Sequence, residues 1–88
     1  MKSIWKYELR GAQTKVEAPV EKWLKVQWQD GTGIVVWAMV NDDLPKRTFW
    51  IHTVGTGWDI ENLEGDYIGS DIDEFGFVWH YFVREVKE

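Results

Sequence analysis

Apolar and polar residues alternate with a period of two along most of this chain, and this alternation limits the folds open to it. In SIWKYELR, Trp5, Tyr7 and Leu9 alternate with charged residues, and WLKVQWQ repeats the pattern. Successive side chains of a β-strand point to opposite faces of a sheet, so a strand with one buried face alternates in this way, whereas a helix repeats about every 3.6 residues. The chain is therefore predicted to fold from strands, and no segment predicts a helix of more than one turn.

Turn-forming residues divide the chain into short strands. Asp30–Gly33 (DGTG) carries the Asp-Gly signal of a tight hairpin, and NDDLPK and DEFG indicate further turns. The polar segment from Gly55 to Asp66 is predicted to be the longest loop. Such spacing is typical of all-β domains, and 88 residues suffice for one core. We therefore predict a single all-β domain over residues 1–88, a small antiparallel β-sandwich or barrel of about seven strands: SIWKYELR, TKVEA, WLKVQWQ, IVVWAMV, RTFWIHTV, YIGSDI and FVWHYFVREV.

The chain is rich in aromatic residues, which make up 16% of it and include seven tryptophans. A core of this size cannot enclose that many indoles, so some rings are expected at a surface or an interface. The strand Ile34–Val40 is apolar on both faces. Such a strand is either central in a sandwich or covered on its outer face by another subunit. These two features favour a homo-oligomer.

Composition excludes several classes of function. The net charge of −5 opposes nucleic acid as a partner, because phosphate contacts need clustered Lys and Arg. The absence of cysteine excludes disulfides, thiolate metal sites and a cysteine nucleophile. No apolar run approaches the ~18–20 residues that span a bilayer, so no membrane association is expected. The cytoplasm is the expected location.

Seven acidic residues lie between positions 59 and 74, where no basic residue occurs. The negative charge is therefore concentrated in one acidic segment of an otherwise balanced domain. Acids crowded in a loop usually form a solvated face. Asp71–Gly76 (DIDEFG) resembles the start of a calcium loop, but Phe75 stands where an oxygen ligand is required. A hairpin turn explains these residues better.

The segment Gly55-Thr56-Gly57 is the most distinctive local motif. It lacks the Lys-Ser/Thr of a phosphate-binding loop and the third glycine of a dinucleotide fold. Two interpretations remain open. Glycine amides could approach a bound anion while Trp50, His52 and Trp58 stack against a base, or the glycines could simply allow the positive φ of a turn.

The remaining candidate residues do not indicate catalysis. His52 and His80 alternate with large apolar residues and are expected to be partly buried and hydrogen-bonded, without the spacing of a metal site. Neither Ser3 nor Ser70 lies in a nucleophile elbow. No carboxyl group is placed in an evident shielded pocket, as general acid–base catalysis requires. We expect neither an enzyme, nor a metal, nor a cofactor.

Six segments occur in an order that resembles a family of short, uncharacterised proteins of bacteriophages and prophages: IWKYEL, LKVQWQ, VVWAMV, VGTG, YIG and FVWHYF. The resemblance covers nearly the whole chain. Members usually carry a histidine directly after the Gly-Thr-Gly, where this chain has Trp58. The resemblance implies a phage origin and brings no established activity.

Small phage proteins outside the virion are often antagonists of host defences, and this setting suggests three functions. The first is a protein of the host-cell cytoplasm that sequesters a nucleotide-like small molecule at a subunit interface. The second is an acidic inhibitor that binds a host defence protein. The third is a minor structural protein of the phage. The first would bind its ligand through Arg47, Trp50, His52, Gly55, Thr56, Gly57, Trp58 and Arg84, and the second would use Trp58, Asp59, Glu61, Glu64, Asp66 and Tyr67.

Overall fold

The computed structural model describes residues 1–87 and contains seven strands. Each predicted strand is present, and the all-β prediction is confirmed. The third strand begins at Val20, directly after Pro19. With ten residues it is longer than the predicted segment WLKVQWQ. The strands are β1 (Lys2–Glu8), β2 (Gln13–Ala18), β3 (Val20–Gln29), β4 (Gly33–Asn41), β5 (Arg47–Gly55), β6 (Asp66–Ile72) and β7 (Val78–Val86).

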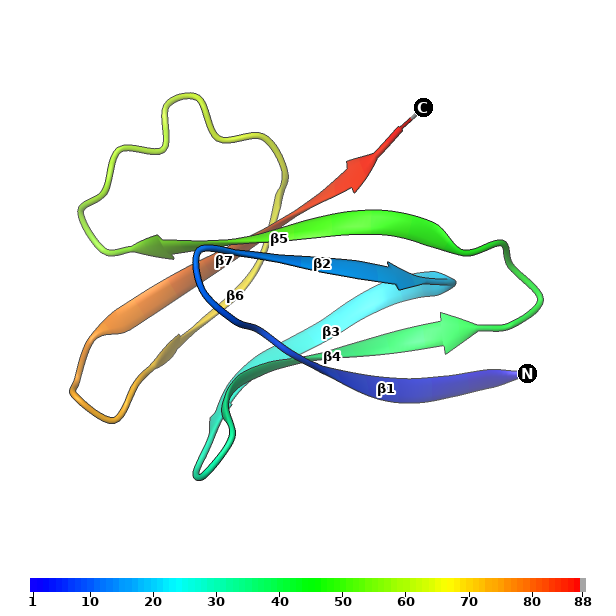
Figure 1. Cartoon of the computed structure of the whole chain (residues 1–88), viewed down its shortest axis with the longest axis horizontal. Coiled ribbons are helices and arrows are strands. Elements are labelled where there is room, and N and C mark those ends of the chain that lie inside the picture. Colours follow the sequence, from blue (N-terminus) through cyan, green and yellow to red (C-terminus); the bar gives the residue numbers. More distant parts are fainter. Residues whose placement is uncertain (88) are drawn as a thin grey trace.

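The strands form two antiparallel sheets (Figure 1). The three-stranded sheet has the order β1-β4-β3, and the four-stranded sheet has the order β2-β5-β7-β6. Both predicted hairpins form: β3 and β4 are joined at Asp30–Thr32, and β6 and β7 at Asp73–Phe77. The connection between β5 and β6 is the long loop predicted from its composition, and it projects beyond the end of β5 in Figure 1.

The two sheets pack face to face, so the domain is a small β-sandwich. In β4 and β5 the inward residues follow the alternation, as in Val36 and Ala38 or Phe49 and Ile51. β3 departs from it, because two register shifts against β4 bring Val20, Trp23, Val26 and Trp28 to the core. Ile51 lies at the centre and is completely buried. The buried core consists of Val16, Ala18, Val20, Val26, Ile34, Val36, Ala38, Val40, Phe49, Ile51, Tyr81 and Val83.

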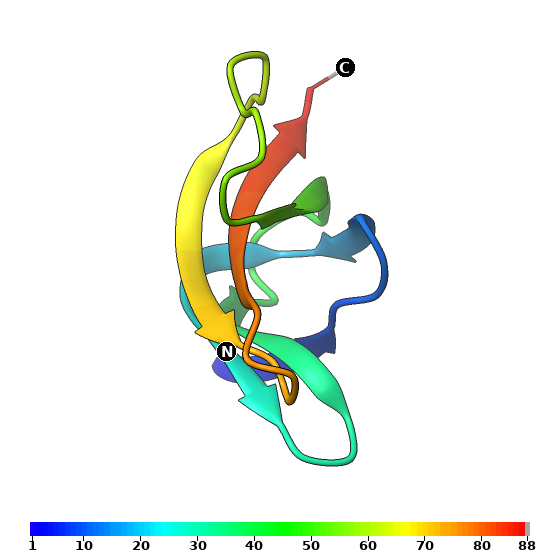
Figure 2. The same ribbon diagram turned by 90° about the vertical axis from the view of Figure 1, so that its left-hand side faces the viewer.

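The sheets come closest where β6 crosses β3. Gly69 has φ = +149°, and a side chain there would place its Cβ 3.3 Å from Val26, so glycine favours this approach. Nearby, the Trp28 amide donates a hydrogen bond of 2.6 Å to Asp71 Oδ2. Figure 2 shows that β6 and β7 are strongly curved at this side of the molecule. Each of β1 and β2 has a neighbour on only one side, and the turn at residues 9–12 joins them.

β4, the strand that is apolar on both faces, is central in its sheet. A central position was one of the two alternatives predicted for it. Its outward residues are Val35, Trp37 and Met39, and Val35 is completely buried. Lys6 and Lys25 stand opposite Trp37 on the two neighbouring strands, and Lys6 Nζ lies 5.7 Å from the centre of the Trp37 ring. Lysine stems can cover apolar surface while the ammonium groups stay in water. The outer face of β4 is thus partly covered within one chain.

The described part of the chain contains no helix long and apolar enough to cross a membrane.

Candidate functional site

The seven tryptophans are distributed as the composition predicted, because none of them is fully buried. Trp5 and Trp58 are more than half exposed, at 57% and 58%. Trp58 lines each of three hollows in the surface. Its ring meets that of Trp79 edge to face, with 5.7 Å between ring centres. The candidate site therefore lies around Trp58.

The segment Gly55-Thr56-Gly57 forms a turn. The Trp58 amide donates to the Gly55 carbonyl over 3.1 Å, and Gly57 has φ = +86°. A Cβ on Gly55 would lie 2.7 Å from Cε2 of the Trp58 indole, so this indole occupies the space above Gly55. The glycines are thus explained by the turn and by close packing against the ring. Within the described residues 1–87, no Lys or Arg lines the hollows beside this turn.

Four polar side chains beside the turn form a continuous chain of hydrogen bonds. His80 Nε2 is 2.8 Å from Thr56 Oγ1, His80 Nδ1 is 2.6 Å from Ser70 Oγ, and Ser70 Oγ is 2.6 Å from the Tyr67 hydroxyl. Thr56 also donates to the Val78 carbonyl. All these contacts are satisfied when Tyr67 donates to Ser70, Ser70 to a neutral His80, and His80 Nε2–H to Thr56. The network ties the turn to β6 and β7.

The predicted ligand residues are only partly brought together. Trp50, His52 and Arg84 share the outer face of the four-stranded sheet, where Trp50 pairs with Arg84. Burial, and next the charge of Arg84, lower the pKa of His52. The expectation of a hydrogen-bonded, half-buried histidine is met by His80, whereas His52 is half-buried without such a partner among residues 1–87.

Arg47 lies apart from the predicted site. It is the first residue of β5 and Gly55 is the last, so roughly 26 Å of extended strand separate them. Its guanidinium donates to the Val20 carbonyl and to Glu85 Oε1. Arg47 therefore stabilises the opposite end of the sandwich.

The residues of the predicted acidic surface are exposed. Asp59, Glu61, Glu64, Asp66 and Tyr67 all lie at the surface on the β5–β6 loop and the start of β6. Within residues 1–87, no ion pair involves an acidic residue of positions 59–74. The segment is therefore an uncompensated acidic surface.

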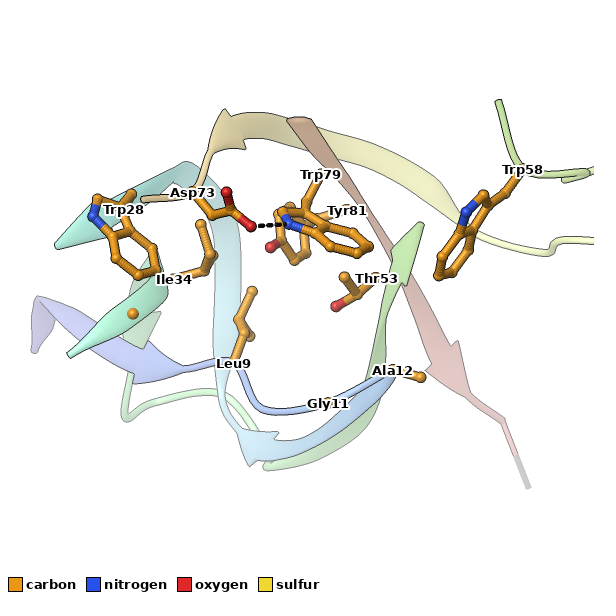
Figure 3. Close-up of a pocket in the computed structure, with 11 residues that line it drawn as sticks. Leu9, Gly11, Ala12, Trp28, Ile34, Thr53, Trp58, Asp73, Trp79 and Tyr81 are labelled. Carbon is orange, nitrogen blue, oxygen red and sulfur yellow. Dashed lines mark hydrogen bonds between the residues drawn. The ribbon is translucent and has the colours of Figure 1, made fainter. Parts of the chain in front are cut away.

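Another hollow lies between the two sheets, and sequence reasoning missed most of its residues. Its volume is about 420 Å³. Trp79 and Tyr81 are inward-facing residues of β7, Trp28 is an inward-facing residue of β3, and Trp58 closes one end (Figure 3). The alternation within each strand could have indicated that Trp28 and Trp79 both face inward. The sequence does not show that the two side chains line the same cavity. We call this the inter-sheet pocket; it is lined by Leu9, Gly11, Ala12, Trp28, Gly33, Ile34, Thr53, Trp58, Asp73, Trp79 and Tyr81.

Tyr81 contributes an unused polar group to the inter-sheet pocket. The residue is only 2% exposed, and its hydroxyl forms no hydrogen bond among the described residues. Because every buried side-chain polar atom there has a partner, this hydroxyl oxygen retains contact with solvent. Figure 3 shows the hydroxyl on the side of Leu9 and Ile34, both of which line the pocket. A ligand in the pocket could supply the missing hydrogen bond.

Among the described residues that line the pocket, Asp73 is the only charged one. Its Oδ2 accepts a hydrogen bond of 2.9 Å from Trp79 Nε1, and its Oδ1 accepts bonds from the amides of Phe75 and Phe77. The bond from the Trp79 indole, followed by the bonds from the turn amides, lowers the pKa of Asp73. The carboxylate is therefore held ionised beside the aromatic wall.

Alkaline pH should destabilise the fold through Tyr81. Burial, and then the charges of Asp71 and Asp73, raise the pKa of Tyr81 from 10.0 to about 12. The unfolded state loses this proton near pH 10 and the folded state near pH 12, so stability is lost as the pH rises through that interval. The contribution is about 2–3 kcal/mol. Urea titrations at increasing pH should show this loss, and Tyr81→Phe should reduce it; equal losses in both proteins would contradict the assignment.

The fold and its hollows define a small all-β sandwich with a tryptophan-lined pocket between its sheets. The model of a family described as a domain of unknown function, DUF7352, matches residues 1–88, and the chain belongs to this family. An uncharacterised family was predicted, and this match confirms it. No curated protein and no solved structure matches the chain.

Proposed function

We propose that the protein is a non-enzymatic binding protein that holds a small aromatic ligand in the inter-sheet pocket. The observation that carries this proposal is a hollow of about 420 Å³ between the sheets, walled by three indoles and lined also by Tyr81, whose hydroxyl forms no hydrogen bond within residues 1–87. Small-molecule sites are typically mostly apolar cavities of about 300–1,000 Å³ with a few polar groups that orient the ligand. The pocket has this composition, with three indoles as walls and Tyr81 as a polar group.

The perpendicular rings of Trp58 and Trp79 favour a flat ligand. Their planes meet at 85°, so one ring can stack on a ligand while the other contacts its edge. Base-sized rings gain about 1–3 kcal/mol from stacking on an aromatic side chain. Because Trp58 is more than half exposed, its far side offers an entry from solvent.

A nucleotide-like ligand at the Gly-Thr-Gly turn stays a prediction with less support from the geometry. The Trp58 indole fills the space above Gly55, and Arg47 lies at the other end of β5. Phosphate groups would meet Asp73 and the acidic segment without a nearby Lys or Arg in the pocket lining. A nucleobase or nucleoside fits these surroundings better than a nucleotide does.

Binding can be tested with a series of related ligands. Adenine, adenosine and AMP share one ring system and differ in sugar and phosphate. Thermal unfolding should shift upward with adenine or adenosine, because a ligand at 100 times its dissociation constant adds about 2.7 kcal/mol of stability. The shift should be smaller for AMP. Benzyl alcohol extends the series to a plain aromatic ring.

A matched pair of tyrosine variants locates the site. Tyr81→Phe should weaken binding of ligands that can hydrogen-bond to the hydroxyl, whereas Tyr67→Phe should not, because Tyr67 lies on the outer face of β6. The reverse result would place the ligand beside the Gly-Thr-Gly turn. No shift with any of the four ligands would count against an aromatic small-molecule site.

The resemblance to phage proteins supplies the setting of the proposal. In this setting the protein is an accessory protein that acts in the host-cell cytoplasm and sequesters a small molecule of host defence. A homo-oligomer is part of the proposal because exposed Trp5 and Ile4 lie on the edge strand β1. Light scattering of the purified protein would show whether it self-associates.

A second function is supported by the acidic segment. Its carboxylates form no ion pair within residues 1–87, and Trp58, Ile60 and Tyr67 are exposed beside them. Exposed aromatic anchors with surrounding charge are typical of protein interfaces, and acidic groups accelerate encounter with a basic partner. Capture of a basic host protein together with a ligand-free inter-sheet pocket would favour this inhibitor function. Binding to phage particles would instead favour the structural role.

A further inference from the structure

We propose that the ligand of the inter-sheet pocket carries a positive charge, so that the pocket is selective for aromatic or alkylated amines. This inference rests on the proposed function and specifies the chemistry of the ligand. It follows from the arrangement of carboxylates and indoles at the end of the pocket near Trp28 and Trp79.

Three carboxylates are held near this end of the pocket by hydrogen bonds. Asp73 lines the pocket and accepts the indole N–H of Trp79 over 2.9 Å. Asp71 accepts the backbone amide of Trp28 over 2.6 Å, and Asp30 accepts the indole N–H of Trp28 over 3.2 Å. Each carboxylate is bound to a backbone or side-chain group of a pocket tryptophan. Their charges therefore have defined positions relative to the cavity.

No nearby cation neutralises these carboxylates. Asp73 is the only charged residue in the lining, and none of the three carboxylates forms an ion pair within residues 1–87. Arg10 follows Leu9 in the chain, but its guanidinium binds Glu8. A positive ligand would thus enter a region of negative potential, and a negative ligand would be repelled.

The indoles add a second attraction for cations. The face of an indole ring carries a partial negative charge, which attracts ammonium groups within about 6 Å of the ring centre. In both Trp28 and Trp79 the N–H points to a carboxylate, so the polar edge is satisfied and the hydrocarbon surface remains available. Figure 3 shows the two rings on either side of Asp73. Tyr81 adds a hydroxyl oxygen that can accept a hydrogen bond from an ammonium group.

Three benzyl compounds test the charge preference because they share a phenyl ring and differ in one polar group. At neutral pH benzylammonium is positive, benzyl alcohol is neutral and benzoate is negative. Titration of the intrinsic tryptophan fluorescence of the full chain should give dissociation constants in that order. We expect benzylammonium to bind about tenfold more tightly than benzyl alcohol, with benzoate weakest. Added salt should reduce the difference between the charged and neutral ligands.

Two variants connect the preference to the carboxylates. Asp73→Asn should reduce the preference for benzylammonium over benzyl alcohol by about threefold or more. Asp30→Asn tests the same point with less risk to folding, because the asparagine carbonyl can still accept the Trp28 indole N–H. Glu17→Gln is the control, since Glu17 lies on the exposed face of β2 and pairs with Lys15.

The outcomes separate this inference from the proposed function. Equal or tighter binding of benzyl alcohol or benzoate would overturn the charge preference and leave the aromatic site in place. A cation preference that survives both aspartate substitutions unchanged would also overturn it, because its source would lie elsewhere. No binding by any of the three compounds, or by adenine and adenosine, would remove the proposed function itself.

Discussion

Gly65→Ala is expected to lower the free energy of unfolding by about 3–5 kcal/mol. Gly65 immediately precedes β6 and has φ = +130°, which an L-residue adopts only with strain of about 1–3 kcal/mol. An added Cβ would also lie 2.6 Å from the carbonyl oxygen of Val83, a backbone atom that cannot rotate away. Val83 pairs with Asp66, the first residue of β6, so relief of the overlap requires loss of this pairing. Overpacking of this kind adds about 1–3 kcal/mol.

Urea denaturation followed by circular dichroism measures this effect, and Gly76→Ala is the matched control. Gly76 also has a positive φ, of +86°, but the space around it is open. Its replacement should therefore cost only the backbone strain, about 1–2 kcal/mol. Similar losses in both variants would mean that the loop before β6 moves away from Val83 easily. In that case the backbone overlap at Gly65 would not contribute to the cost.

Several strands could be predicted from the sequence because they are amphipathic by themselves. Tyr7 and Leu9 pack against the core as the alternation in SIWKYELR indicated, and Asp-Gly at Asp30 marked the first hairpin. The pairing of the sheets was not predictable in this way. β2 follows β1 in the chain but pairs with β5, and the close approach of β6 to β3 depends on Gly69. Such contacts depend on residues far apart in sequence, which no local pattern encodes.

The site was less predictable than the fold. The Gly-Thr-Gly motif indicated either a turn or an anion site, and only coordinates show the Trp58 indole above Gly55. The inter-sheet pocket was missed because its aromatic residues come from separate strands and a loop. The tryptophan content did carry a usable signal, since it predicted that indoles would line surfaces. It did not show which of the seven tryptophans would share a cavity.

Trp58→Ala is expected to weaken benzylammonium binding by about tenfold or more while the protein stays folded. The indole closes one end of the inter-sheet pocket and stacks edge to face on Trp79, so its loss removes a wall of the site. Large aromatic anchors commonly contribute 2 kcal/mol or more to binding, on the order of thirtyfold in affinity. Because Trp58 is 58% exposed, its removal should cost far less stability than removal of a core side chain.

Trp37→Ala provides the control for this binding experiment. Trp37 is a half-buried indole that lies on the outer face of β4, next to Lys6, and contributes to none of the three hollows. Titration by calorimetry avoids the change in tryptophan fluorescence that either variant introduces. Affinity should fall for Trp58→Ala and stay unchanged for Trp37→Ala. If both variants bind like the wild-type protein, the ligand does not contact Trp58, and the pocket between the sheets loses its defining wall.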